Sequence, residues 1–297
     1  MSHSKRLISN LLLVVAAFIW GSAFVAQSVG MDYIGPLTFN ATRSFIGTLV
    51  LLPVIRFMDH RGNPNKPVTA ADRKILLTGG LCCGLVLFCG STLQQIGLTQ
   101  TSAGKAGFIT AMYIIIVPLL GLFFKKRVPA FVWISVVLGV TGMYLLCVTE
   151  GFSLQWSDTM VILSAFFFAG HILVIDHFSP RVDGVRLSAL QFLVAGTLSL
   201  IAMFIFEQPN FSAILSAWMP LLYAGVLSSG IAYTLQIVAQ KHTDPTVASL
   251  LMSLESVFAA LSGAVILRET LSGRELTGCV LMFIAIILAQ LPEKKKQ

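Results

Sequence analysis

Ten apolar stretches, arranged as two similar sets of five, run through this chain. A transmembrane helix needs about 20 predominantly apolar residues, and these stretches are apolar on every face instead of alternating as barrel strands do. Apolar residues make up 56% of the 297 positions and charged residues only 11%. The sequence therefore predicts an all-α membrane protein with ten transmembrane helices. The expected spans are 7–28, 36–57, 75–98, 102–124, 129–147, 158–178, 187–206, 216–238, 246–267 and 273–291.

Short sequence matches relate the two sets of five. Gly47-Thr48-Leu49 recurs 149 positions later as Gly196-Thr197-Leu198, and Thr92-Leu93-Gln94 recurs 142 positions later as Thr234-Leu235-Gln236. Five crossings per copy turn the second copy upside down, so we expect two inverted five-helix repeats. Such repeats let secondary transporters open to either side of a membrane by rocking equivalent halves. The expected repeats cover residues 1–147 and 157–297.

The formal charge of +7 is distributed unevenly along the chain. Most of the 20 Lys and Arg residues fall in the two tails and in alternate loops, on the side that carries the amino terminus. The positive-inside rule then places both termini in the cytoplasm. The basic balance is explained by orientation in the membrane, and no nucleic-acid partner is expected.

Two ionisable groups are expected at membrane depth, where charge is costly and marks a functional candidate. Glu255 lies near the middle of the ninth segment. Removal from water disfavours its charged form, which suits proton coupling or binding of a cationic group; a structural ion pair or a hydrogen bond to the backbone is the alternative. Arg43 lies at a similar depth in the second segment. We favour a structural pair, with Glu255 as the candidate partner, over contact with a substrate carboxylate or phosphate.

Three further side chains fall near the same depth. The offset of 142 pairs Tyr113 with Glu255, so two polar groups occupy equivalent positions where transporter sites lie. Trp20 lies beside Gly21, whose missing side chain permits close helix approach; Trp20 either walls a substrate cavity or packs against a neighbouring helix. His171 lies in the sixth segment, and a structural hydrogen bond is favoured there over a proton relay or substrate contact.

Gln94, near the outer end of the third segment, and Gln236, near the inner end of the eighth, are repeat-mates, one at each mouth. We expect them to help close opposing gates, with helix capping or hydrogen bonding between helices as the alternative. Two further sequence patterns are candidates for a cofactor or metal site, and neither fits one. Thr101 to Gly107 resembles a phosphate-binding loop, but Ala106 stands where Ser or Thr would coordinate magnesium. The five cysteines lack metal-ligand spacing, so neither a cofactor nor a metal is expected.

A set of motifs spread over both halves is typical of one family. The motifs are Trp20-Gly21-Ser22, Arg43, Gln94 through Gly97, Thr101, Phe108-Ile109, Pro118, Lys126-Arg127, Ser253 through Ala260 and Arg268-Glu269. With them the chain resembles the EamA-type, ten-helix members of the drug/metabolite transporter superfamily. The resemblance implies a carrier of small organic metabolites in the plasma membrane, often exporting, with a central cavity. The family commonly has Pro after the Glu of the second repeat. Here Ser256 follows Glu255, which leaves a helix break at that point open.

We therefore expect a multi-pass secondary transporter of the plasma (inner) membrane that exports amino-acid-like or drug-like metabolites, with its cavity near Trp20, Tyr113, His171 and Glu255. Its expected partners are a small-molecule substrate and the lipid bilayer, with protons as the candidate coupling ion and a homodimer among the options. A lipid or polyprenyl-linked flippase is an alternative that requires a lateral opening toward lipid. A membrane-embedded enzyme is another, and it requires a nucleophile and a base within reach.

Overall fold

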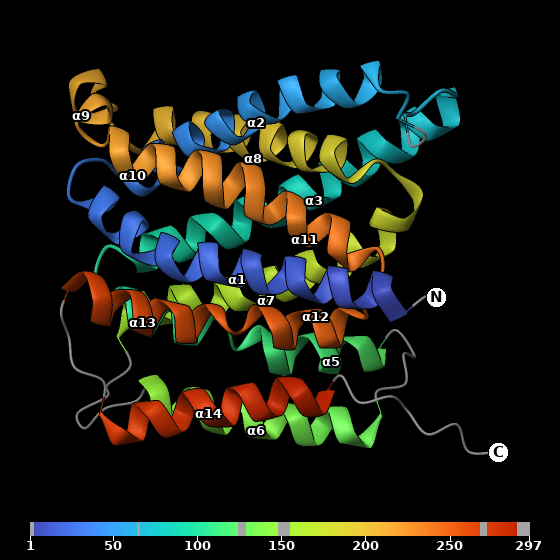
Figure 1. Cartoon of the computed structure of the whole chain (residues 1–297). Coiled ribbons are helices and arrows are strands. Elements are labelled where there is room, and N and C mark those ends of the chain that lie inside the picture. Colours follow the sequence, from blue (N-terminus) through green and yellow to red (C-terminus); the bar gives the residue numbers. More distant parts are fainter. Residues whose placement is uncertain (1–2, 64–65, 124–128, 148–154, 268–271, 290–297) are drawn as a thin grey trace.

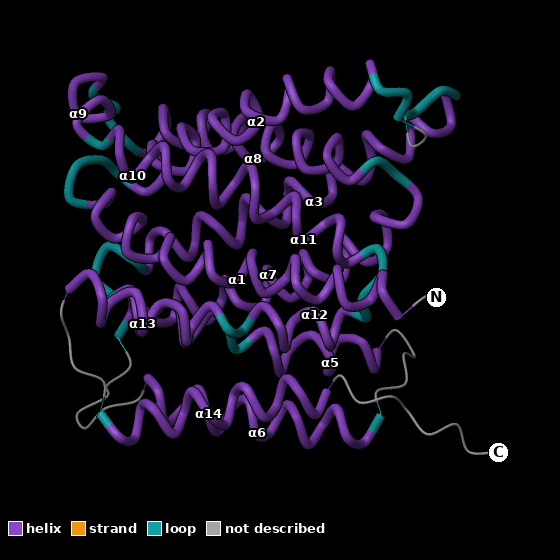
Figure 2. Tube along the Cα trace, viewed as in Figure 1, coloured by secondary structure: helices purple, strands orange, loops and turns teal. Residues whose placement is uncertain are grey.

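The computed structural model describes residues 3–63, 66–123, 129–147, 155–267 and 272–289. These residues are almost entirely helical and contain no strand (Figure 2). Within them, eight helices are long and apolar enough to cross a membrane, and residues 130–145 form a shorter apolar helix. The prediction of an all-α membrane protein is confirmed, while the count of ten spans stays a prediction.

The first half of the chain contains α1 (His3–Met31), α2 (Pro36–His60), α3 (Ala70–Gly97), α4 (Ala103–Thr110), α5 (Tyr113–Phe123) and α6 (Ala130–Cys147). The second half contains α7 (Trp156–Phe178), the 3₁₀ turn η1 (Ser179–Arg181), α8 (Gly184–Phe206), α9 (Phe211–Ser216), α10 (Trp218–Leu222), the π-helix η2 (Tyr223–Ala232), α11 (Tyr233–Gln240), α12 (Pro245–Met252), α13 (Glu255–Leu267) and α14 (Gly273–Ala289).

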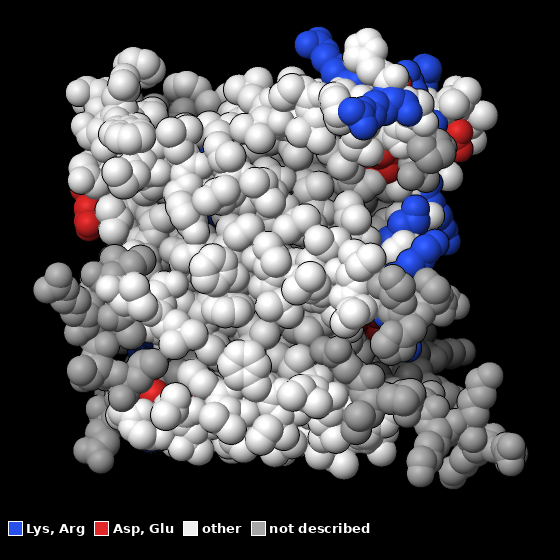
Figure 3. Space-filling view, in the orientation of Figure 1, with Lys and Arg blue, Asp and Glu red and all other residues white. Residues whose placement is uncertain are grey.

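The helices form a bundle in which corresponding elements of the two halves pack together. α2 packs along α8 at one edge, α6 packs along α14 at the other, and α1, α3, α7 and α11 lie between them (Figure 1). α1 begins and α14 ends at the same end of the bundle (Figure 1). Lys and Arg side chains gather at that end, and the middle of the visible face is uncharged (Figure 3). The largest apolar core joins side chains of both halves, among them those of α1, α4, α5, α6, α7, α12 and α14.

Two spans are broken at equivalent points. α4 and α5 are separated by Ala111 and Met112, and α12 and α13 by Ser253 and Leu254, which lie 142 positions further on. At each break the backbone bonds shorten from four residues to three: the Met112 amide donates to Ile109 (3.1 Å), and the Leu254 amide donates to Leu251 (3.3 Å). The break beside Glu255 is therefore present without the proline that is common in the family.

The eighth expected span differs from the single α-helix that the sequence predicts for residues 216–238. It runs as α10, η2 and α11, and its middle is a wide π-helical stretch. Such stretches are rare and often lie at functional sites. Here the widened stretch presses against α2, because a Cβ atom added to Gly225 would lie 2.6 Å from the Ile46 Cβ. It also brings Ser228 to the central cavity described below.

Candidate functional site

A small buried cavity lies where the two helix breaks face each other. Its volume is about 40 Å³, room for about three water molecules at roughly 10–15 Å³ of accessible volume each. The seven side chains singled out from the sequence all line it: Trp20, Arg43, Gln94, Tyr113, His171, Gln236 and Glu255. The other lining residues are Phe24, Gln27, Thr110, Phe168, Ile172, Ser228, Tyr233 and Met252. The bundle is thus closed around a partly polar centre.

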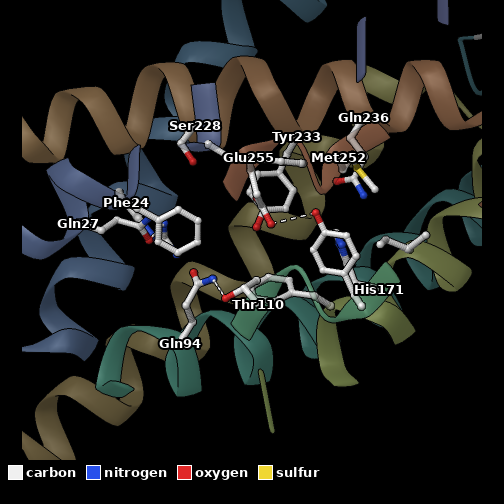
Figure 4. A pocket seen from close by; sticks show the side chains of 15 residues that line it. Phe24, Gln27, Gln94, Thr110, His171, Ser228, Tyr233, Gln236, Met252 and Glu255 are labelled. Atoms are coloured by element: carbon white, nitrogen blue, oxygen red, sulfur yellow. Dashed lines mark hydrogen bonds between the residues drawn. The ribbon is translucent and has the colours of Figure 1, made fainter. Parts of the chain in front are cut away.

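Tyr113 and Glu255 join the two halves at this centre. Each is the first residue of the helix that follows its break, and the Tyr113 hydroxyl donates to Glu255 Oε1 over 2.9 Å (Figure 4). Both side chains are buried. Gly21 lets α13 approach α1 closely, since an added Cβ atom would lie 2.6 Å from the Glu255 carbonyl oxygen. The carboxyl is therefore fixed between α1 and α5, with Tyr113 as its recorded side-chain partner among the described residues.

Arg43 places a guanidinium in the same cavity. Its Nη1 donates to Gln27 Oε1 over 2.9 Å, and its Cζ lies 5.9 Å from the centre of the Phe39 ring. Arg43 forms no ion pair with Glu255 in the described part of the chain, so the favoured structural pair is replaced by a neutral amide partner. A guanidinium carries five N–H donors. With one hydrogen bond recorded for it, Arg43 retains donors for a further acceptor in the cavity.

An aromatic cluster centred on Tyr233 forms one wall. The Tyr233 ring meets Trp20 edge-on at 4.8 Å between centroids and His171 at 5.8 Å. His171 Nε2 lies 2.9 Å from Gln191 Oε1, and the role of His171 stays a prediction. The Trp20 Nε1 is buried and has no hydrogen-bond partner within the described residues. That N–H group is a second donor that faces no recorded acceptor.

Gln94 and Gln236 lie on opposite sides of the cavity (Figure 4). Gln94 donates to Thr110 Oγ1 over 3.0 Å, and Gln236 donates to Gln240 Oε1 over 2.9 Å. The first contact joins α3 to the end of α4, beside the first break, and the second lies within α11. Both glutamine side chains are buried. Their expected role in gating stays a prediction.

Sequence reasoning missed several lining residues, of which Gln27 and Tyr233 contribute most. Gln27 could have been found from helical spacing, because Trp20, Phe24 and Gln27 follow the three- and four-residue steps of one helix face. Tyr233 gives no comparable signal. It reaches the cavity from the start of α11, directly after the π-helical stretch that the sequence did not predict.

Comparisons with known proteins agree with this architecture. A family model described as the EamA-like transporter family matches residues 7–148 and 155–291. A protein of Archaeoglobus fulgidus named an uncharacterized transporter is 30% identical over 97% of this chain and 87% of its own length. The Escherichia coli K12 protein named uncharacterized inner membrane transporter YedA is 23% identical over 92% of this chain and 87% of its own.

Two further comparisons extend the range of relatives. A WAT1-related chloroplast protein of Arabidopsis thaliana is 26% identical over 95% of this chain and 69% of its own length. One solved crystal structure superposes with a TM-score of 0.77 at 18% identity, covering 95% of this chain and 96% of its own. At that identity the likeness shows the fold alone. Apolar spanning helices around a closed polar centre define a multi-pass membrane transporter. The chain belongs to the EamA-like transporter family.

Proposed function

We propose that this membrane transporter is a secondary carrier of amino-acid-like metabolites that works by alternating access. The observation that carries the proposal is the pairing of opposite charges in one buried cavity: Arg43 from α2 and Glu255 from α13 both line it without forming an ion pair together. Ionisable groups are retained at membrane depth where substrates or ions are handled. A solute that brings both an anionic and a cationic group would satisfy both.

Substrate recognition follows from the groups around these charges. The Arg43 guanidinium suits a carboxylate, whose two oxygens it can bind with parallel N–H groups. The Glu255 carboxyl suits an ammonium group, and the ring edges of Trp20 and Tyr233 supply an apolar wall for a side chain. A cavity of about 40 Å³ is too small for such a molecule, so the cavity must widen for loading, as alternating access requires.

Proton coupling is assigned to Glu255. A carboxyl group removed from water exchanges a proton for a substrate ammonium at low electrostatic cost, because one positive charge replaces another. Tyr113 stays as a neutral donor to the carboxyl in either case. The pseudo-twofold relation of the two breaks gives the carboxyl a similar environment when either end opens.

The orientation follows from charge. Lys and Arg gather at the end of the bundle where α1 begins and α14 ends (Figure 3), which supports cytoplasmic termini by the positive-inside rule. The name of the Escherichia coli relative supports the inner membrane as the location. We assign export as the direction of transport, as the resemblance of the sequence implies.

The two alternatives have less support. A flippase needs the cavity to open sideways toward lipid, whereas fourteen of the fifteen lining side chains are buried and Trp20 is half-buried. A membrane-embedded enzyme is disfavoured because the family and its named relatives are transporters.

Counterflow into proteoliposomes tests the substrate class. Radiolabelled amino acids are compared with the matched amine, which lacks the carboxylate, and the matched acid, which lacks the ammonium group. We expect uptake of at least one amino acid and little uptake of either relative. Arg43→Gln should remove the preference for the amino acid over the amine, because the carboxylate then has no guanidinium to bind. Equal uptake of all three compounds by the unaltered protein would rule out recognition of a zwitterion.

A further inference from the structure

A second, larger space lies on the opposite side of α1 from the cavity. It is an open groove of about 570 Å³, within the range of about 300–1,000 Å³ found for ligand pockets. We call it the lateral groove. Its lining is almost wholly apolar, and no charged residue contributes to it in the part of the chain that the structure describes. It is lined by Phe18, Ser22, Val25, Ala26, Val29, Met219, Pro220, Tyr223, Phe258, Leu261, Ser262 and Val265.

α1 separates the lateral groove from the cavity. Phe18, Ser22, Val25 and Val29 follow steps of four, three and four residues, so they share one face of the helix. Trp20 and the other cavity residues of α1 lie on the other face. α10 and α13 flank α1 and form the two rims (Figure 1). All three helices lie in candidate membrane spans or continue from one, so the groove opens on the surface that the bilayer covers.

The length of the lateral groove matches one leaflet. Phe18 and Val29 are eleven residues apart, which corresponds to roughly 16 Å along a helix. The hydrocarbon core of a bilayer is about 30 Å thick, so the groove covers about half of it. It runs from the middle of α1 toward the Met31 end. Trp218, 57% exposed, lies at the start of α10 beside that end, and exposed Trp favours the membrane interface.

The two central polar groups of the lateral groove satisfy each other. Ser22 Oγ and Tyr223 Oη lie 2.5 Å apart, and Ser22 Oγ also donates to the Phe18 carbonyl within α1 over 2.9 Å. These hydroxyls therefore need no hydrogen bond from a molecule in the groove. A polar metabolite would lose its hydration there without gaining partners, whereas a hydrocarbon chain would lose nothing.

We propose that the lateral groove is a binding site for one acyl chain of a membrane phospholipid, held between α1, α10 and α13 with its headgroup at the Trp218 end. The lipid is a resident ligand and is separate from the transported substrate. Phe258, which lines the groove, lies one turn from Glu255 on α13. The bound chain therefore packs against the helix that carries the central carboxyl.

Photolabelling tests this site. The protein is reconstituted in vesicles of phosphatidylcholine that carries a diazirine in one acyl chain, irradiated, and mapped by peptide mass spectrometry. Peptides that contain the groove residues of α1 and α13 should be labelled several-fold more than the face of α14 around Ile284 and Ile287, which is exposed and lies outside the groove. Equal labelling of both surfaces would overturn the proposal.

Variants make the test specific. Ala26→Trp fills the lateral groove and should lower its labelling to the level of α14, while Val15→Trp, on an exposed part of α1 outside the groove, should leave it unchanged. Val29→Trp, near the headgroup end, provides a second filling variant should Ala26→Trp not fold. Unchanged labelling in a folded filling variant would overturn the site. Movement of fluorescent phosphatidylcholine across the bilayer that only the filling variants abolish would also overturn it, because the lipid would then be cargo.

Discussion

The α4–α5 break and the α12–α13 break share a backbone and differ in chemistry. Each follows an eight-residue helix, spans two residues, and ends at a polar side chain that begins the next helix. In the first half that side chain is Tyr113, and in the second half it is Glu255. Had both been carboxyls, their like charges would repel at this distance. A neutral donor in one copy instead stabilises the single carboxyl in the other, so one duplicated framework yields one ionisable centre.

The starts of α4 and α12, which lie at opposite ends of the bundle (Figure 1), differ in the side chains that hold them. At the start of α4, Asp158 of α7 accepts from Lys105 Nζ (2.6 Å) and from Thr101 Oγ1 (2.9 Å). At the start of α12, Thr243 occupies the position of Thr101, and Ser9 occupies that of Asp158. The Thr243 hydroxyl is buried and has no recorded partner within the described residues. The start of α4 is therefore held by a charged cluster, which we call the Asp158 latch, whereas no such cluster holds the start of α12 within the described residues.

The largest effect should come from separating the roles of the two break residues. Glu255→Gln removes the proton-carrying group and should reduce accumulation driven by a pH gradient by about tenfold or more, equal to at least about 1.4 kcal/mol. Tyr113→Phe removes one hydrogen bond and should cost about two- to tenfold in substrate affinity while the response to the pH gradient remains. Flux in proteoliposomes with and without the gradient measures both.

The comparison fails if the two variants behave alike. An unaltered gradient response in Glu255→Gln, with a verified substrate, would remove the coupling role. Loss of that response in Tyr113→Phe would mean that the hydroxyl, and not the carboxyl alone, handles the proton.

Many residues of the central cavity could be predicted from the sequence, because the repeat fixes the depth of each residue in the membrane. The offset of 142 pairs Tyr113 with Glu255 from the sequence alone, and a polar residue within an apolar span is itself a candidate. The breaks themselves could not be predicted. Ala111 and Ser253 are not helix breakers, and the turns form through tertiary packing; the Ser253 hydroxyl bond to the Leu250 carbonyl (2.8 Å) is a local contribution that many unbroken helices share.

The π-helical stretch was missed for a similar reason. Most of its residues are apolar or small, as a close-packed α-helix would also require, and hydrophobic periodicity does not report the number of residues per turn over ten positions. The pairing of Arg43 was missed because depth alone does not say which helices adjoin. Gln27 is nearer in the fold than Glu255, although both were available at a similar depth.

The Asp158 latch should bias the bundle toward closure at its own end. Asp158→Asn keeps an acceptor for Thr101 but weakens the contact with Lys105, whose side chain is 20% exposed. In burial this ion pair is intermediate. Breaking an exposed pair costs about 0.2–1 kcal/mol, and breaking a buried one costs about 3–5 kcal/mol. We expect a three- to tenfold faster reaction of a single cysteine at Thr110 with a membrane-impermeant thiol reagent added from the Lys105 side. The background lacks the five native cysteines.

Thr243→Val is the matched control for the Asp158 latch. It removes an unpartnered hydroxyl at the equivalent position of the other half, so the cysteine should react within about twofold of the unaltered rate, equal to about 0.4 kcal/mol. Similar acceleration in both variants would show that the two ends are equally held, and that the charged cluster contributes nothing to the conformational equilibrium.

A packing effect should distinguish the repeat-mates Gly21 and Gly170. An added Cβ atom at Gly21 would lie 2.6 Å from the Glu255 carbonyl oxygen, while at Gly170 its nearest neighbour would be Val86 Cγ1 at 3.7 Å. Gly21→Ala should therefore overpack the α1–α13 contact and cost about 1–3 kcal/mol, seen as a thermal midpoint lower by several degrees. Gly170→Ala should be neutral or slightly stabilising, because Ala favours a helix interior. Equal midpoints would show that α13 can move away from α1 freely.

The smallest effect concerns the caps at the starts of α4 and α12, which are again 142 residues apart. Asp244 accepts from the Thr246 amide over 2.8 Å, whereas Ser102 accepts from the Lys105 amide over 3.4 Å. A shorter bond to a charged acceptor at a helix N-terminus is the stronger one. Asp244→Ala should cost about 1 kcal/mol of unfolding free energy, and Ser102→Ala less than about 0.5 kcal/mol because its hydrogen bond is long. Thermal unfolding in detergent compares them. If Ser102→Ala were the more harmful, the start of α4 would depend on its cap and not on the Asp158 latch.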